Sequence, residues 1–385
     1  MKKNNKTAKT AKAVKRADKP THAEKPGKGP ITIGMDLGDR TSRYCVLDGD
    51  GKVVKEGSAA TTRAGMTQVY GSMKRCRIAM EVGTHSPWVS RLLKGMGHEV
   101  IVANPRQLKA ITDSSRKDDK VDAQMLGRLA RVDPELLRPI RHRGEEAQLD
   151  LMMIRARASL VKTRTELVNA IRGFSKSVGE RLASCDTDQM GWEKLAELPV
   201  GLQAVLKPLA EQISAMTASI KEYDKELEQI AKVKYPETRL LTQVGGVGTL
   251  IALTFVLTVE DKERFQRSRD AGCYVGLRPR RSDSGESQPQ LRITKEGDMY
   301  LRSMLVQGAH HILSERGVDS DLKRWGLKLA EARREEREEA GDRGGSAEAR
   351  DSAACAVGDG GSIRTVAEHA FGGTAERKAG GVDLL

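Results

Sequence analysis

The sequence predicts a mixed α/β domain near the N-terminus, then long helices, and then a mostly helical C-terminal domain. Three observations predict this order. Short apolar segments that suit buried strands are concentrated before residue 104. Apolar residues at three- and four-residue spacing then extend over residues 145–178 and 209–230. A glycine-rich turn at residues 245–248 opens a further group of helical segments.

The first part of the chain places strand and helix signals in a defined order. Three strand segments joined by short turns come first, and helical and strand segments then alternate. The expected strands are residues 31–38, 42–47, 52–56, 77–83 and 98–103, and the expected helices are residues 62–74, 87–96 and 116–131. This is the order of an RNase H-like domain, which we place at residues 30–144.

Acidic residues end two of these strands, Asp36 on the first and Glu81 on the fourth. Strand ends along one edge of an α/β sheet are where ligand-binding groups gather. Asp119 and Asp122 are three residues apart, so they share one face of the helix that follows. Four clustered carboxylates would repel one another and would require a divalent cation. The helix pair alone is also compatible with a solvated helix start, where the helix dipole favours acids.

The helix over residues 116–131 carries two further sets of side chains. The apolar residues expected to anchor it to a core are Val121, Met125, Leu126 and Leu129. The basic residues that surround the acids are Lys117, Lys120, Arg128 and Arg131. A phosphate would therefore meet both a metal ion and basic side chains here.

Residues 145–236 are expected to form a helical hairpin or coiled coil. Pro208 suits the first turn of its second helix. Apolar residues then alternate in steps of four and three at Leu209, Ile213, Met216, Ile220, Tyr223, Leu227 and Ile230. This pattern suits a hairpin that also forms a coiled coil with a second copy of the chain. A bundle within one chain is equally compatible with it.

The segment 237–326 begins with a turn that resembles a helix-hairpin-helix, with Gly246 and Gly248 between apolar helices. Backbone N–H groups of such a turn bind a phosphate, although similar turns also join core helices without a ligand. Helical segments follow at residues 265–277 and 299–313.

A basic loop separates these two helical segments. Its arginines are Arg278, Arg280 and Arg281, and Ser284 and Gly285 follow them. The loop offers the serine positive charge and room for attack on a phosphate. A Ser-Gly pair is also ordinary turn chemistry.

Composition indicates an anionic partner. The chain of 385 residues has a formal net charge of +13, and aromatic residues make up only 3% of it, so contacts to phosphates must outweigh base stacking. The five cysteines include no C-x-x-C pair, which indicates a reducing cytoplasm rather than a disulfide framework or a zinc knuckle. No apolar run reaches membrane length. We expect disorder in a basic arm at residues 1–29 and in an acidic, glycine-rich tail at residues 327–385.

Residues 31–325 resemble bacterial insertion-sequence transposases that have an N-terminal DEDD, RuvC-like domain and a C-terminal serine-bearing transposase domain. These are the bridge-RNA-guided recombinases, relatives of the pilin-gene invertases. The matching segments are residues 33–36, 80–83, 102–105, 117–123, 246–248, 276–279, 284–285 and 293–297, with Arg302. The family has Lys-Thr-Asp where this chain has Lys117, Asp118 and Asp119, and Asp119 stays in register.

The resemblance implies a recombinase in which Asp36, Glu81, Asp119 and Asp122 hold two Mg²⁺ ions, for which Mn²⁺ can substitute. Ser284 is then the nucleophile that forms a phosphoserine link to DNA. Similar proteins bring the acids of one subunit to the serine of another, which implies a homo-oligomer, a dimer or a tetramer. They also use a structured guide RNA to choose donor and target double-stranded DNA. This implies a bacterial, cytoplasmic protein associated with the nucleoid.

The resemblance and the positive charge together give a set of nucleic-acid-binding candidates. These are Lys117, Lys120, Arg128, Gly246, Gly248, Arg278, Arg280, Arg281, Lys295 and Arg302.

Two other functions are compatible with the same residues. A Holliday-junction-type nuclease would use the four acids and water, but it leaves Ser284 without a role. A non-catalytic nucleic-acid scaffold is the other alternative. It is favoured by the tail from Glu331 onwards, which has acidic runs where the family has a basic, apolar helix. We attribute this tail to a reading-frame shift, which the other reading frames of the gene would test.

Overall fold

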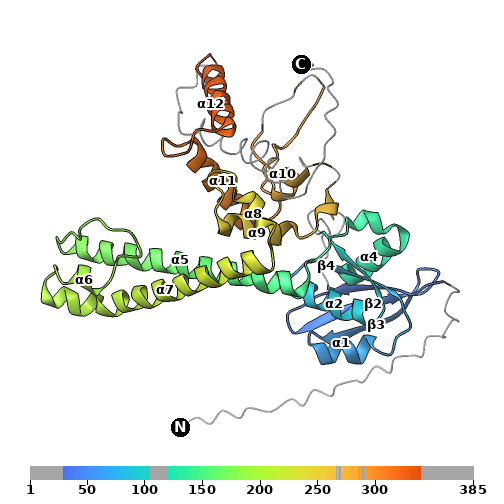
Figure 1. Cartoon of the computed structure of the whole chain (residues 1–385). Helices are drawn as coiled ribbons and strands as arrows, with labels where there is room; N and C mark the ends of the chain where they lie inside the picture. Colours follow the sequence, from blue (N-terminus) through green and yellow to red (C-terminus); the bar gives the residue numbers. More distant parts are fainter. Residues whose placement is uncertain are drawn as a thin grey trace, which may run out of the picture. The chain divides into compact units, whose positions relative to one another are not determined.

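The computed structural model describes residues 29–104, 119–265, 267, 270–285, 287 and 291–339 (Figure 1). The chain divides into two compact units, Met1–His142 and Arg143–Leu385. Among the helices of the described ranges, none combines the length and the apolar character needed to cross a membrane.

The first unit contains one mixed sheet of five strands in the order β3-β2-β1-β4-β5. The strands are β1 (Thr32–Asp36), β2 (Thr41–Leu47), β3 (Val53–Ala60), β4 (Arg77–Glu81) and β5 (Glu99–Ala103). β1 pairs antiparallel with β2 and parallel with β4, so the central strand joins an antiparallel half to a parallel half. The predicted mixed α/β domain is confirmed, and its strand order is consistent with an RNase H-like domain.

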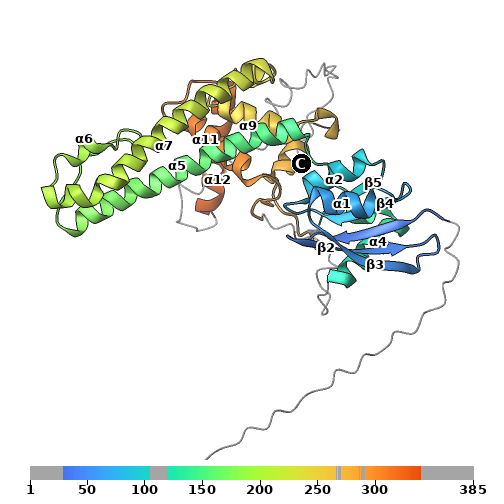
Figure 2. The same ribbon diagram turned by 90° about the horizontal axis from the view of Figure 1, so that it is seen from below.

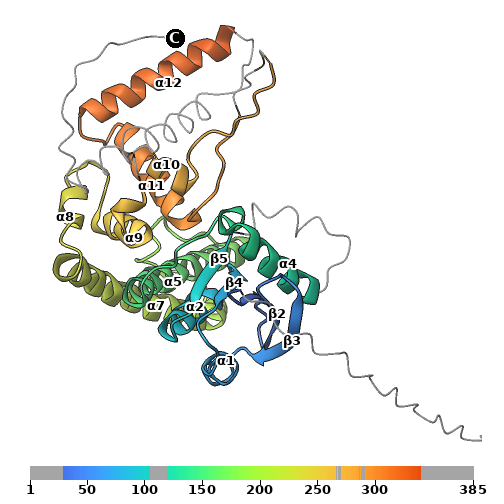
Figure 3. The ribbon, with the colours of Figure 1, turned by 90° about the vertical axis from the view of Figure 1, so that its right-hand side faces the viewer.

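Helices cover both faces of this sheet (Figure 3). They are α1 (Arg63–Tyr70), α2 (Ser86–Gly95) and α4 (Asp119–Val132), followed by the short 3₁₀ helix η2 (Pro134–Leu137). Alternate residues of a strand face opposite sides. Ile33 and Met35 of β1 therefore pack into the cluster under α1 and α2. Gly34 faces the other side, where α4 lies.

The second unit begins with a long antiparallel helical hairpin, in which α5 (Glu145–Ser177) and α7 (Val200–Val233) run side by side (Figure 2). The short helix α6 (Trp192–Leu195) lies at its tip. One apolar cluster at the tip includes Val168 and Leu206, and another at the base includes Leu151 and Leu227.

Polar side chains join the two hairpin helices between these clusters. Arg157 Nε lies 2.5 Å from an Asp224 carboxylate oxygen, and Arg164 donates to the Thr217 hydroxyl at 3.2 Å. The hairpin therefore has two apolar ends and a polar middle section.

The position of Pro208 was predicted wrongly. α7 begins at Val200, directly after Pro199, so Pro208 lies inside the helix rather than in its first turn. An internal proline removes one backbone hydrogen bond, and the long apolar contact with α5 offsets this loss. Ile213 and Ile220 are buried within the chain, and Met216 and Tyr223 are half-buried. The heptad pattern is therefore used at least in part inside one chain.

Most of the C-terminal helices pack around a core that includes Leu241, Phe255 and Leu305, whereas the last helix packs through Leu322 on the helix before it. They are α8 (Thr238–Leu241), α9 (Thr249–Val259), η3 (Lys262–Arg264), α10 (Asp270–Val275), α11 (Met299–Leu313) and α12 (Asp321–Glu339). The helix predicted at residues 265–277 is shorter than expected. Helix α12 continues past residue 327 to Glu339 through a run of strong helix formers, and the disordered tail expected at residues 327–385 stays a prediction.

Candidate functional site

The acids on the strand ends lie next to each other. Met35 of β1 pairs with Met80 of the parallel strand β4, so Asp36 and Glu81, the next residue on each strand, end adjacent strands. Met35 and Met80 face the cluster under α1 and α2. Because alternate residues face opposite sides, both carboxylates are directed to the α4 face of the sheet.

Close packing of α4 on β1 brings the other two acids to this face. A Cβ at Gly34 would overlap the backbone of Ala123, and a Cβ at Gly127 would lie 3.0 Å from the Gly34 nitrogen. The helix and the strand therefore meet backbone to backbone. This contact requires a strand residue and a helix residue without side chains.

The buried stripe of α4 differs from the predicted one. It consists of Ala123, Leu126, Gly127 and Ala130, whereas the predicted anchors Val121 and Met125 are only half-buried. Small residues take this place because the backbones lie so close together. Leu126 and the half-buried Leu129 do pack into the core, as predicted.

Asp119 and Asp122 extend the buried stripe of α4 by one turn. Asp119 lies four residues before Ala123, and Asp122 lies four residues before Leu126, so both acids are on the sheet-facing side of the helix. Asp122 is half-buried and Asp119 is exposed.

Electrostatics show that the four predicted acids act on one another. Burial raises the pKa of Asp36, and the negative charges of Asp119 and Asp122 raise it further. Burial also raises the pKa of Glu81, and the charges of Asp36 and Asp122 add to this shift. The fold therefore holds acids together against repulsion, which is the arrangement that a cation relieves.

The donor chemistry of this cluster fits a divalent cation, because carboxylate oxygens are the ligands that Mg²⁺ prefers. Within the described ranges, no three Asp, Glu, His or Cys side chains are already gathered closely enough to hold an ion. Binding would therefore require the carboxylates to rotate toward one another. Asp36, Glu81 and Asp122 are the members linked most directly by the pKa shifts.

A histidine close in sequence to Glu81 was missed by the sequence analysis. His85 follows Glu81 by four residues, and its Nδ1 accepts a hydrogen bond from Trp88 Nε1 at 3.1 Å. Because tryptophan only donates, the proton of the neutral imidazole is on Nε2, which lies 3.2 Å from Asp39 Oδ1. A search just beyond each acidic strand end would have found both His85 and Asp39.

The second predicted element, the serine loop, comprises residues 276–297 of the other unit. Its two sides pair near the base, where Arg280 N donates to Arg292 O at 3.0 Å and Thr294 N donates to Arg278 O at 2.9 Å. Further out, Ser284 forms two backbone hydrogen bonds with Ser287.

Ser284 therefore lies in a tight turn, next to Gly285 at a φ of +58°. Its side chain is exposed and makes no hydrogen bond to the described residues. The turn chemistry expected of a Ser-Gly pair is present, and it leaves the hydroxyl accessible.

A cavity of about 310 Å³ lies on the serine loop. Its lining residues are Cys273, Arg278, Pro279, Arg280, Arg281, Thr294 and Glu296. The three predicted arginines thus line one hollow, close in sequence to Ser284. Arginine side chains suit phosphate oxygens.

The predicted nucleic-acid-binding residues lie in different surroundings. Gly246 has a φ of +81° and packs directly on Gly308 of α11, so the structure gives it a packing role, while Gly248 is the N-cap of α9. Arg302 donates to the carbonyls of Val275 and Glu296, both at 2.8 Å, and so binds the base of the serine loop. The exposed basic candidates within the described residues are Lys120, Arg128, Arg278, Arg280, Arg281 and Lys295. Lys117 lies outside the described residues.

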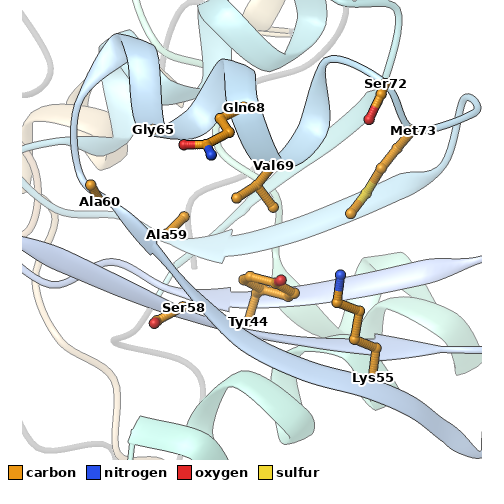
Figure 4. A pocket seen from close by; sticks show the side chains of 10 residues that line it. All are labelled: Tyr44, Lys55, Ser58, Ala59, Ala60, Gly65, Gln68, Val69, Ser72 and Met73. Carbon is orange, nitrogen blue, oxygen red and sulfur yellow. The ribbon is translucent and has the colours of Figure 1, made fainter.

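Another cavity, of about 560 Å³, lies between α1 and the edge strand β3 (Figure 4). Tyr44 forms its floor, and Lys55 and Gln68 are directed into it from opposite walls. None of the predicted site residues lines it. This hollow is separate from the acid cluster, which is on the α4 face of the sheet.

Comparison with known proteins decides the family. A profile for the transposase domain of the IS110 DEDD type matches residues 33–178, and one described as "Transposase IS116/IS110/IS902 family" matches residues 238–322. The chain is 30% identical over 311 residues to the transposase for insertion sequence element IS1111A of Coxiella burnetii, covering 78% of this chain and 83% of that protein. This chain belongs to the IS116/IS110/IS902 transposase family.

Other relatives agree with this assignment. A probable family 20 transposase of Pseudomonas aeruginosa is 26% identical over 76% of this chain and 87% of its own length. The transposase for insertion sequence element IS1328 of Yersinia enterocolitica is 27% identical over 72% of this chain and 82% of its own length. The IS110-family chain is thus an insertion-sequence transposase, an enzyme that cuts and joins DNA. The predicted family and enzyme class are confirmed.

Proposed function

We propose that this transposase cuts and rejoins DNA through a covalent phosphoserine intermediate formed by Ser284. The observation that carries the proposal is a pair of reactive elements. One is a cluster of mutually repelling carboxylates, and the other is an exposed serine on the same loop as three arginines that line a cavity. The acids alone would serve a hydrolytic nuclease. The accessible hydroxyl favours transfer to the protein.

In the proposed step, Ser284 Oγ attacks a DNA phosphorus while the bond from phosphorus to the 3′ oxygen breaks. The serine proton passes to a carboxylate, and the departing 3′ oxygen takes up a proton. The phosphoserine bond keeps the energy of the phosphodiester, so a 3′-hydroxyl of an exchanged strand can reverse the step without ATP. Arg278, Arg280 and Arg281 hold the negative charge of the phosphate.

Asp36, Glu81, Asp119 and Asp122 would hold Mg²⁺, with Mn²⁺ as a substitute. A bound ion supplies Lewis-acid stabilisation of the charge that develops on the phosphate. The half-buried acids Asp36, Glu81 and Asp122 are the core of this set, and the exposed Asp119 completes it.

We propose that the protein works as a homo-oligomer on donor and target duplexes chosen by a structured guide RNA. Two features support delegation of sequence readout to RNA. Aromatic residues are scarce, and the candidate contact residues are basic side chains suited to backbone phosphates. Exposed apolar side chains on the hairpin, such as Phe174 and Val205, support self-association.

A covalent-adduct assay tests the proposal. Supercoiled DNA carrying the element ends is incubated with protein, Mg²⁺ and the transcript of the element, and the denatured mixture is examined for protein bound to DNA. We expect an adduct with the unaltered chain and with Ser287→Ala or Ser282→Ala, and none with Ser284→Ala. Cleavage without adduct, equal in all variants, would instead identify a hydrolytic nuclease.

A further inference from the structure

The serine loop is fastened at its base to helix α11. Gly276 and Gly297 face each other across this base, where a Cβ at either residue would overlap backbone atoms of the opposite side. Arg302, in the first turn of α11, donates one hydrogen bond to each side of the base, to Val275 O and to Glu296 O. A displacement of the start of α11 therefore displaces the base of the loop.

The start of α11 is in turn fastened to the hairpin by one carboxylate. Asp298 is the N-cap of α11, and its Oδ1 accepts a hydrogen bond from Leu301 N at 2.9 Å. Its other oxygen, Oδ2, lies 2.7 Å from Arg155 Nη2 on α5. The Asp298 side chain is only 10% exposed, so water competes little for this carboxylate.

A neighbouring tyrosine adds an apolar contact between the start of α11 and the hairpin. Tyr300, the second residue of α11, packs into the apolar cluster at the base of the hairpin, which also contains Leu151 and Leu227. Burial raises the pKa of its hydroxyl. The ion pair therefore forms beside a packed apolar contact, which restricts the geometry in which Arg155 meets Asp298.

From these contacts we infer that Arg155 is a positioning residue for the DNA-cutting serine: through Asp298 and Arg302 it sets the place of the serine loop relative to the hairpin. Arg155 does not contact the reacting atoms. Its role deepens the proposed function, because it rests on Ser284 as nucleophile. Assembly through the hairpin and chemistry at the serine would then be mechanically connected within each subunit.

The chain offers a matched control for this inference. Arg157 is two residues away on α5 and forms an ion pair with Asp224, but that pair joins the two hairpin helices. Arg157→Gln therefore removes an arginine and an ion pair while the pair between Arg155 and Asp298 stays in place, although the charge of Arg157 also acts on the Tyr300 hydroxyl. Asp298→Asn tests the other partner, because asparagine still caps a helix but loses the charge that Arg155 binds.

The experiment measures two quantities in Arg155→Gln, Asp298→Asn and Arg157→Gln. The first is amide hydrogen exchange of Thr294 and Lys295, whose N–H groups pair across the loop base. It should rise about threefold to fivefold in the first two variants, the size expected for loss of a half-exposed ion pair. The second is the rate of covalent adduct formation at saturating DNA. It should fall about tenfold or more, because small misplacements of reacting groups are costly, while the DNA dissociation constant stays unchanged.

Arg157→Gln should leave both quantities near their original values, and Arg155→Lys should recover part of the adduct rate. The inference is overturned if Arg155→Gln changes neither quantity, or if Arg157→Gln changes both as strongly. If the unaltered chain forms no adduct, the proposed function fails, and the exchange measurement alone then decides whether Arg155 fixes the loop.

Discussion

Gly34→Ala should impair catalysis although residue 34 carries no reactive group. The added Cβ would overlap the carbonyl oxygen of Ala123 and lie 2.9 Å from its carbonyl carbon. Non-bonded carbon atoms prefer a separation of about 3.5–4.0 Å. Helix α4 must therefore retreat from β1 by more than about half an ångström, and on the order of 1 Å to clear the oxygen.

This retreat carries Asp119 and Asp122 away from Asp36 and Glu81. Misplacement of about 1 Å can cost about a hundredfold in rate, and we expect a loss of this size in Mg²⁺-dependent strand cleavage. Overpacking should also lower the free energy of unfolding by about 1–3 kcal/mol. Cleavage rates on supercoiled DNA and thermal melting measure the two effects.

Two other glycines give a graded comparison. A Cβ at Gly127 would lie 3.0 Å from Gly34 N and 3.2 Å from a Leu47 methyl, so Gly127→Ala should have a milder effect. Gly83 lies two residues after Glu81 and has no atom within 4 Å of an added Cβ, so Gly83→Ala should behave normally. Full cleavage activity and Mg²⁺ affinity in Gly34→Ala would refute the view that backbone contact sets the acid geometry.

Three further predictions follow from the site and the hairpin. Asp122→Asn should abolish cleavage but leave DNA affinity nearly unchanged in binding assays, because ligands of a catalytic metal act mainly on the transition state. Cleavage at the original rate would contradict the assignment of Asp122 as a metal ligand. Because the pKa values of Asp36 and Glu81 are raised in the folded chain, ionisation of these carboxyls lowers the free energy of unfolding. This destabilisation is absent below their ordinary pKa values of 3.8 and 4.5, and it grows as the pH rises through the raised values. In EDTA at pH 7, Asp36→Asn should therefore melt at a higher temperature than the unaltered chain, and Mg²⁺ should stabilise only the unaltered chain; equal melting in EDTA would argue against this repulsion. Phe174→Lys should lower the oligomer mass in light scattering without unfolding the chain, because this side chain is 53% exposed. Ile213→Lys should instead unfold the hairpin, because Ile213 is fully buried. An unchanged mass in Phe174→Lys would exclude this face of the hairpin from the interface.

The sequence predicts the strands of the first unit well because local signals define them. Alternating apolar residues and turn residues at Asp48 and Gly51 mark their ends, and Asp36 and Glu81 follow from the strand boundaries. The four acids could be grouped because two lie on strand ends and two share one helical turn. The raised pKa values of Asp36 and Glu81, to which the charges of Asp119 and Asp122 contribute, agree with that grouping.

Other features depend on contacts between distant segments and leave no local signal. The role of Gly34 depends on Gly127, more than ninety residues away, and a helix-period search favours Val121 over the small residues that are actually buried. Arg302 looks like a phosphate ligand in the sequence, yet its guanidinium binds two backbone carbonyls. The sequence alone therefore does not show whether a basic residue near a glycine-rich loop binds a phosphate or a backbone carbonyl.

The polar middle section of the hairpin has a consequence for how this element opens. The tip cluster around Val168 and the base cluster around Leu151 are separated by Arg157, Asp224 and Arg164, so they need not lose their structure together. Proteins open locally in roughly contiguous cooperative units that differ in stability. The tip can therefore open locally while the base, which includes Tyr300, keeps its packing. Such a hairpin would have an adaptable tip and a firmly packed base.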